Sequence, residues 1–279
     1  MVTQRARTLI EVVRQSGRIE KARLVAALFL ISKGSPGPGM VESYEFIPFH
    51  HGPFSFELDH DLEALGREGY LKIVGDDIAF VDHAKSSGDA DIAEVVAGLM
   101  DELTGLSNEA LKVSIYGIYP EITIFSDDDR RMVYRRDRTG IANIGYEGRS
   151  IDGFLKVLID DRTQILVDVR ADPFSRKYGY SSDVLSRLLA KVGIEYLPRR
   201  DLSIPSRLRK AARSESGIDG LLSWYSSLLD SNPELVKGIA WLGAERRIAL
   251  MCYEWDASQC HRGVLSSRIR DLGSTVEEL

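Results

Sequence analysis

The spacing of apolar residues in the first part of the chain predicts mainly helices. Ala6, Leu9, Ile10 and Val13 recur at the helical period, and similar spacings follow downstream. Two runs rich in strand-forming residues flank the Gly-Asp-Asp sequence at 75–77, which favours a hairpin. Three helices followed by a hairpin are the order of a winged helix-turn-helix. The predicted helices span 5–15, 19–33, 55–68, 89–104 and 107–116, the hairpin strands span 70–74 and 78–81, and a strand-like run at 44–49 precedes a turn at 52–53.

The pattern changes after residues 127–140, where clustered aspartates and arginines form a charged linker. Beyond it, short apolar runs alternate with helical patterns, which predicts a mainly parallel sheet covered on both faces. We therefore expect an α/β chain, with a winged-helix-like domain at 1–126 (α+β), a linker at 127–140 and a mainly parallel-sheet α/β domain at 141–279. In the last domain the expected strands are 141–145, 164–170, 194–197 and 247–251, and the expected helices are 150–159, 183–192, 217–230, 233–243 and 260–272.

Composition excludes several classes of protein. With 44% hydrophobic and 28% charged residues and a formal charge of −6, the chain is typical of globular proteins and is no polycation. The longest apolar run, 25–31, is too short to span a bilayer, and the N-terminus has an amphipathic pattern instead of that of a signal peptide. Two cysteines in 279 residues do not form a disulfide framework. We expect a cytoplasmic protein without a membrane contact, and no cofactor is indicated.

Acidic residues follow the predicted strands of the second domain. Ligands of open α/β sheets bind beyond the carboxyl ends of the strands, so these side chains are expected to face one crevice. Two carboxylates in a crevice can divide the roles of general acid and base, as hydrolysis of a glycosidic or phosphodiester bond requires. Alternatively, Asp168 only holds its loop through backbone N–H groups. The candidate catalytic residues are Glu147, Asp168, Glu254 and His261.

Cations near the same strand ends indicate an anionic ligand, and the N-termini of the helices that follow add partial positive charge. The alternative is a network of ion pairs between these arginines and the carboxylates. The candidate phosphate- or nucleic-acid-binding residues are Arg149, Arg170, Arg176, Lys177 and Arg262. A second basic run follows the third strand and comprises Arg199, Arg200, Arg207, Arg209, Lys210 and Arg213.

Both cysteines, Cys252 and Cys260, lie close to His261 and Arg262. Four interpretations stay open: a zinc site, a disulfide, a reactive thiol and a packing role. The spacing is not that of a zinc finger, and adjacent Cys260 and His261 at a helix start are expected to point apart, so no metal site is assigned. A helix N-terminus beside a cation lowers the pKa of a thiol, which keeps a thiol role for either cysteine open. The packing role is favoured.

Several ordered motifs resemble a bacterial and archaeal family catalogued as "domain of unknown function 488", over residues 141–272. The family implies a compact α/β domain and no established reaction. The segment 199–203 departs from the more acidic, Gly-containing sequence expected there. The resembling motifs are 144–150, 168–181, 204–206, Cys252-Tyr253-Glu254 and Cys260-His261-Arg262.

The first 125 residues are similar to winged-helix modules of bacterial antitoxin-like and mobile-element proteins. This resemblance rests on the segments 44–49, 52–55 and 116–123.

Three functions are compatible with these observations. The first is an enzyme that acts on a nucleic acid or nucleotide, as a hydrolase of a glycosidic or phosphodiester bond. The second is a DNA-binding regulator that senses a phosphorylated ligand, and the third is a module that binds a protein through the winged helix. Carboxylates on the predicted recognition helix argue against ordinary docking in the major groove. They are Glu57, Asp59, Asp61, Glu63 and Glu68.

Overall fold

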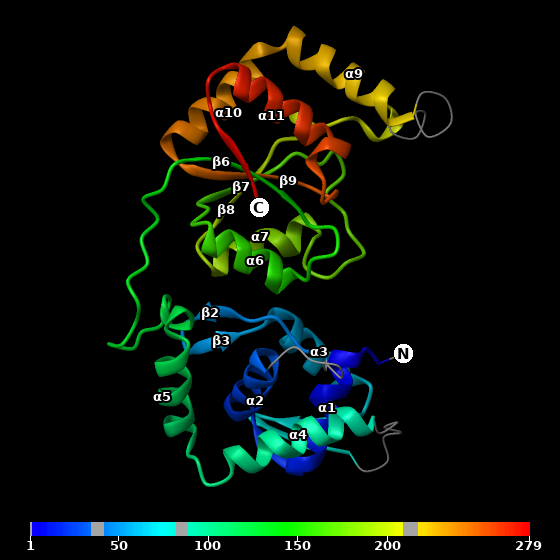
Figure 1. Cartoon of the computed structure of the whole chain (residues 1–279). Coiled ribbons are helices and arrows are strands. Elements are labelled where there is room, and N and C mark those ends of the chain that lie inside the picture. The colour runs from blue at the N-terminus through cyan, green and yellow to red at the C-terminus, as the bar shows by residue number, and fades with distance from the viewer. Residues whose placement is uncertain (1, 35–41, 82–88, 209–216) are drawn as a thin grey trace. The chain divides into compact units, whose positions relative to one another are not determined.

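The computed structural model describes residues 2–34, 42–81, 89–208 and 217–279. Arg209, Lys210 and Arg213 of the second basic run lie outside the described residues. The chain divides into two compact units, Met1–Tyr134 and Arg135–Leu279 (Figure 1). The boundary falls within the segment 127–140, for which a linker was predicted, while the predicted domain limits themselves stay a prediction.

The N-terminal unit combines helices with a small antiparallel sheet of strand order β1-β5-β4. Hydroxyl caps begin three of its helices, because Thr3 accepts from the amide of Ala6, Ser55 from that of Leu58 and Ser107 from that of Ala110. Each helix begins and ends within two residues of its predicted position. The elements are α1 (Gln4–Ser16), β1 (Arg18–Glu20), α2 (Lys21–Lys33), α3 (Phe56–Arg67), β4 (Leu71–Val74), β5 (Asp77–Phe80), α4 (Ala90–Leu103), α5 (Asn108–Ile118) and the 3-10 turn η1 (Pro120–Thr123).

The turn predicted at 52–53 is wrong. Residues 52–54 form the strand β3 (Gly52–Phe54), which pairs with β2 (Ile47–Phe49), and the two histidines between the strands form the turn. Gly52 has φ +108°, and a Cβ there would lie 3.2 Å from the Tyr116 ring. Glycine is therefore present to admit this close contact and not to make the turn.

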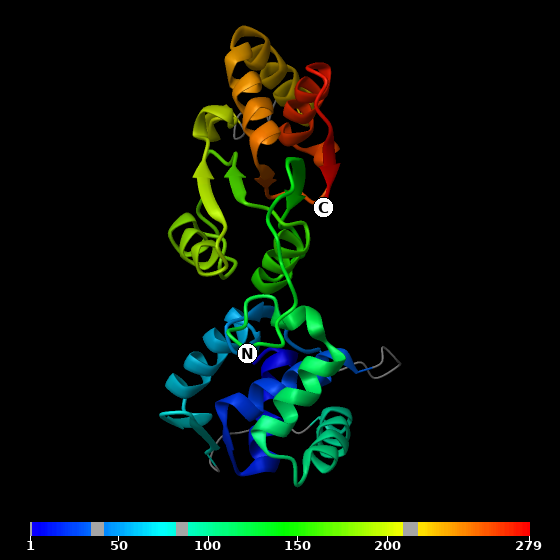
Figure 2. The same cartoon turned by 90° about the vertical axis from the view of Figure 1, so that its left-hand side faces the viewer.

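A mixed α/β fold forms the C-terminal unit, around a five-stranded parallel sheet of order β10-β6-β9-β7-β8. The helices α6 and α7 cover one face, and α9, α10 and α11 cover the other (Figures 1 and 2). The elements are β6 (Gly140–Gly145), α6 (Ile151–Asp160), β7 (Ile165–Asp168), α7 (Ser182–Lys191), β8 (Glu195–Pro198), the 3-10 turn η2 (Arg200–Leu202), α9 (Gly217–Ser231), α10 (Pro233–Glu245), β9 (Arg247–Cys252), the 3-10 turn η3 (Ala257–Gln259), α11 (His261–Asp271) and β10 (Val276–Glu278).

The central strands are buried on both faces. Every residue of β7 and of β9 is buried, which is why both strands are almost continuous apolar runs in the sequence. The edge strand β10 was not predicted, because three residues with two glutamates carry no strand pattern. It pairs with β6 in parallel, and the amide of Leu279 extends the pairing by donating to the Asn143 carbonyl at 3.0 Å.

Candidate functional site

The candidate site lies at the carboxyl edge of the parallel sheet, where β6, β9 and β7 are neighbours in that order. Backbone pairing continues beyond the strand ends. The Tyr146 amide donates to the Cys252 carbonyl at 3.3 Å, and the Val169 amide donates to the Met251 carbonyl at 3.2 Å. The segments that follow the three strands are therefore held side by side, as the position of their sequence motifs predicted.

The loop that carries Glu254 passes directly over the end of β6. A Cβ on Gly145 would lie 2.0 Å from the Glu254 carbonyl oxygen, so only glycine allows this approach. Arg262, which is fully buried, fixes the same loop by donating to the carbonyls of Ile144 and Glu254 at 3.0 Å each and to that of Trp255 at 3.3 Å. Arg262 thus positions the loop from within, while its predicted role in anion binding stays a prediction.

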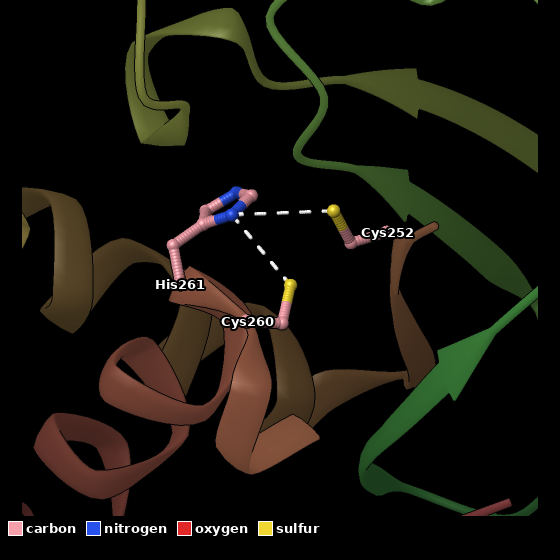
Figure 3. Close-up of side chains that lie close together, drawn as sticks. All are labelled: Cys252, Cys260 and His261. Carbon is pink, nitrogen blue, oxygen red and sulfur yellow. Dashed lines mark hydrogen bonds between the residues drawn. The ribbon is translucent and has the colours of Figure 1, made fainter. Parts of the chain in front are cut away.

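Cys252, Cys260 and His261 form a compact buried group, here called the thiol–imidazole cluster (Figure 3). Cys252 ends β9, Cys260 is the N-cap of α11 and His261 is its first residue. Their potential ligand atoms all lie within 4.8 Å of one another, and His261 Nδ1 is 3.6 Å from Cys260 Sγ and 4.0 Å from Cys252 Sγ. Both thiols are free, and the three residues are 3 to 6% exposed.

The pair Cys260 and His261 was expected to point apart, and the structure brings their side chains to one point. Cys260 has extended backbone angles (φ −135°, ψ 146°) because it precedes the first helical residue. The angle of about 100° between successive side chains on a helix therefore does not apply to this pair.

Mutual contacts perturb the pKa values of this group. The pKa of the Cys252 thiol is well below its usual value, chiefly because the Cys260 thiol donates to it and also because His261 is close. The pKa of the Cys260 thiol is raised by that same hydrogen bond and by burial. Burial lowers the pKa of His261, but the neighbouring Cys252 outweighs it and the net shift is upward. Cys252 therefore carries the more acidic of the two thiols.

Glu254 lies against the two thiols of the cluster. Burial raises the pKa of its carboxyl group and the neighbouring Cys252 raises it further, while a contact with the Cys260 thiol lowers it, and the net shift is upward. Its Oε2 atom is buried and accepts no hydrogen bond from the residues that the structure describes. Two of the four predicted catalytic residues, Glu254 and His261, are thus together, and both surround the cysteines.

Asp168 and Arg170 form a buried ion pair next to the cluster. The Arg170 guanidinium donates to both carboxylate oxygens, with Nη2 to Oδ2 at 2.7 Å and Nε to Oδ1 at 2.9 Å. The Arg170 amide also donates to Oδ1 at 3.0 Å. Burial lowers the pKa of Arg170, but its bonds to Asp168 outweigh this effect and the net shift is upward. Both alternatives from the sequence, an ion pair and a loop held through a backbone N–H group, are therefore present at Asp168.

Three tyrosines that the sequence analysis did not single out complete this ion pair. Tyr196 donates to Asp168 Oδ2 at 2.6 Å, and Arg170 donates to the Tyr146 hydroxyl at 3.2 Å and to the Tyr180 carbonyl at 2.9 Å. The rings of Tyr146 and Tyr180 are stacked with centroids 4.3 Å apart. Both of these tyrosines lie inside segments that carry the resemblance given from the sequence, 144–150 and 168–181, and this is the signal by which they could have been found.

The remaining predicted residues surround Trp255 or lie on the surface. Glu147 is exposed and accepts the Trp255 amide at 3.0 Å, and the Arg149 guanidinium lies over the Trp255 ring at 4.2 Å. Arg176 is exposed, and Lys177 is half-buried with its ammonium 5.6 Å from the centre of the Tyr180 ring. Trp255 also borders a shallow depression of about 970 Å³ that α11 and the end of the chain line further.

The fold and this edge of the sheet define an α/β unit with a candidate site of cysteine, histidine and glutamate. Residues 150–269 match the family model described as "Domain of unknown function DUF488". The match includes the Asp168–Arg170 pair, Glu254 and the thiol–imidazole cluster, and it supports the resemblance of the C-terminal part. Comparison with curated proteins and with solved structures found no match.

None of the helices in the described parts of the chain combines the length and the apolar character that crossing a membrane requires.

Proposed function

We propose that the C-terminal unit is a hydrolase of a nucleotide or a nucleic acid, in which Glu254 activates the attacking water. The observation that carries this proposal is the buried Oε2 of Glu254, which accepts no hydrogen bond from the described residues. A buried polar atom without a partner costs free energy, and such atoms in native proteins require an explanation. One such explanation is that the Glu254 carboxylate is kept for a water molecule or for the substrate.

The position of Glu254 supports the same role. The residue follows β9, the central strand, at the edge of a parallel sheet where ligands of α/β proteins bind. Gly145 and Arg262 hold the backbone of Glu254 in place, so the carboxylate is presented from a fixed loop. A general base must be held within hydrogen-bond reach of the proton that it takes, and a fixed loop meets this requirement.

A base-bearing substrate is supported by the surroundings of Trp255, the next residue along the chain. Its side chain is 59% exposed, carries Arg149 over its ring and borders the depression of about 970 Å³. An aromatic ring stacks on nucleobases, and a guanidinium binds phosphate. Exposed Arg176 is a further cation available to an anionic substrate.

The test is a hydrolysis assay with nucleosides, nucleotides, single-stranded DNA and RNA, with products separated by chromatography. Wild type should release product, and Glu254→Gln should reduce the rate by about 10²- to 10⁴-fold. Glu245→Gln, an exposed change at the end of α10, should retain the wild-type rate. No product from any substrate would overturn the proposal, and equal rates for wild type and Glu254→Gln would remove Glu254 from the mechanism.

The N-terminal unit is proposed to be a winged-helix module. Its order α1, β1, α2, α3, β4, β5 supports this proposal, as does the pairing of β1 with β5, which makes β4 and β5 the wing.

A protein partner is the second candidate function of this unit. Only some of the carboxylates of α3 are free to repel DNA. Glu57 is buried and pairs with Arg5 at 2.7 Å, and Asp59 pairs with Lys21 at 2.8 Å. Glu63 is exposed. An apolar groove of about 530 Å³, bordered by the β2–β3 hairpin, α2 and α5, favours contact with another protein over contact with DNA phosphates.

A further inference from the structure

The thiol–imidazole cluster contains the donor atoms that soft divalent cations select. Thiolate sulfur and imidazole nitrogen are the preferred ligands of Zn²⁺, and two cysteines with one histidine are a known catalytic donor set. We infer that Cys252 Sγ, Cys260 Sγ and His261 Nδ1 bind a zinc ion. This inference does not depend on the hydrolase activity proposed above.

The distances within the cluster suit one tetrahedral ion. Zinc–ligand bonds of about 2.0 Å to nitrogen and about 2.3 Å to sulfur place a nitrogen and a sulfur ligand about 3.5 Å apart in a tetrahedron. His261 Nδ1 is 3.6 Å from Cys260 Sγ and 4.0 Å from Cys252 Sγ. All three atoms lie within 4.8 Å of one another, so small side-chain rotations complete the geometry.

The orientation of the His261 ring provides an independent argument. Its Nε2 lies 3.0 Å from the Val169 carbonyl oxygen, which can only accept, so Nε2 carries the proton. In the neutral ring Nδ1 is then unprotonated, and its lone pair faces both sulfur atoms (Figure 3). Metal-binding histidines almost always donate their other ring N–H in this way, commonly to a backbone carbonyl.

The surroundings of the cluster favour a bound cation over a role in packing alone. The Tyr225 ring meets the His261 ring edge-on, with centroids 5.2 Å apart, and the cluster belongs to the apolar core beneath α9, α10 and α11. The two buried thiols and the half-buried Glu254 carboxylate lie close together there. A bound divalent cation attracts a carboxylate and thiolates alike and so offsets their mutual repulsion. Glu254 would then stand next to the ion.

The experiment uses the reduced full-length chain, freed of metal by a chelator, and titrates it with Co²⁺ in place of Zn²⁺. One equivalent should produce the thiolate-to-cobalt charge-transfer band and the intense visible bands of a tetrahedral site, and Zn²⁺ should abolish both. Zn²⁺ should also raise the unfolding temperature, because a ligand that binds only the folded state stabilises it. A chain with two reduced thiols that gives no charge-transfer band would overturn the inference.

Variants locate the site. Cys252→Ser and Cys260→Ser should each weaken the charge-transfer band and lower the affinity for Co²⁺ by at least tenfold, and His261→Gln should lower the affinity to a similar extent. His51→Gln, an exposed change in the N-terminal unit, should bind like wild type. Wild-type binding that survives the change of both cysteines would place the ion elsewhere and refute this site. Circular dichroism checks that each variant is folded, and the wild-type titration decides the question without them.

The two proposals fail separately. Cobalt binding is measured without substrate, so its absence would leave the hydrolysis assay informative. Conversely, a chain that binds one equivalent of Co²⁺ but hydrolyses no nucleotide would refute the proposed function alone. A thiol assay before the titration must count two free thiols per chain, so that a disulfide between Cys252 and Cys260 is not mistaken for a lack of metal binding.

Discussion

Asp168 and Arg170 show at the scale of single residues how a conspicuous carboxylate can serve the loop around it. The carboxylate accepts three hydrogen bonds from the Arg170 side chain, one from the Arg170 backbone and one from Tyr196. Asp168 is 1% exposed and Arg170 is 4% exposed. Removing one member of such a pair leaves the other charge buried without a partner, which destabilises proteins strongly.

We therefore expect Asp168→Asn to lower the free energy of unfolding by about 3 to 5 kcal/mol, because the Arg170 guanidinium loses its counter-charge. Urea denaturation followed by circular dichroism measures the change. Asp172→Asn, an exposed change four positions away, should stay within about 0.5 kcal/mol of wild type. An Asp168→Asn chain of wild-type stability would show that the ion pair contributes little to the free energy of unfolding.

At the scale of elements, the site depends on one crossing of backbone segments. The loop after β9 lies against the last residue of β6, and Gly145 leaves no room for a side chain between them. A second close approach, at Gly263, fits η3 onto the first turn of α11, where a Cβ would lie 2.2 Å from the Ala257 carbonyl oxygen. Two glycines thus set the position of the segment that carries Glu254 and the cysteines.

Gly145→Ala should displace the loop after β9, because the new methyl group would lie 2.0 Å from the Glu254 carbonyl oxygen. We expect a loss of about 1 to 3 kcal/mol in the free energy of unfolding, the usual cost of overpacking, and a loss of the proposed hydrolysis. Chemical denaturation and the nucleotide assay measure the two effects. The matched change Gly238→Ala, inside α10 with open space around its Cβ, should be neutral or stabilising. Equal behaviour of the two variants would contradict the steric argument.

Sequence periodicity predicted the long elements well, because each has several turns or a continuous apolar run that reports its burial. The short strands β1 and β10 were missed, since three residues cannot display a period and their pairing partners are far along the chain. The turn expected at Gly52-Pro53 failed for a related reason. Both residues favour turns locally, but a strand partner and the contact with Tyr116 determine their conformation.

The sequence was enough to predict which edge of the sheet carries the candidate site, but it was not enough to predict how the side chains are arranged there. Strand-end placement correctly gathered Asp168, Cys252 and Glu254 at one edge of the sheet. The convergence of Cys260 and His261 depends on an extended N-cap residue, and backbone angles at a helix boundary cannot be obtained from side-chain spacing. Which arginines hold backbone carbonyls, as Arg262 does, likewise follows only from the folded loop.

At the scale of the whole molecule, the distribution of charge favours a protein over DNA as the partner of the N-terminal unit. A mild net charge of −6 provides no general attraction to DNA, and α3, the candidate recognition helix, contains Arg67 as its only lysine or arginine. Arg5, on α1, already forms ion pairs with Glu57 and Asp61. A helix that enters the major groove needs cations for the phosphates and polar donors for the bases, and α3 offers few of either.

The full-length chain should therefore leave duplex DNA unretarded in an electrophoretic shift assay, at low as well as at high salt concentration. The physical reason is that few phosphate contacts are available, so few counterions can be released on binding. A shift that appears at low salt and disappears at high salt would contradict this prediction and would favour the DNA-binding regulator over the protein partner.

The strand order β10-β6-β9-β7-β8 has a consequence for synthesis on the ribosome. The strands β6, β7 and β8 emerge first, yet β6 and β7 do not pair with each other, because β9 lies between them. The nascent sheet therefore stays split until Arg247–Cys252 has left the exit tunnel, and such delayed long-range pairing exposes apolar edges that chaperones protect. The segment that joins the two halves of the sheet also delivers the first cysteine, so the candidate site is among the last parts of the molecule to form.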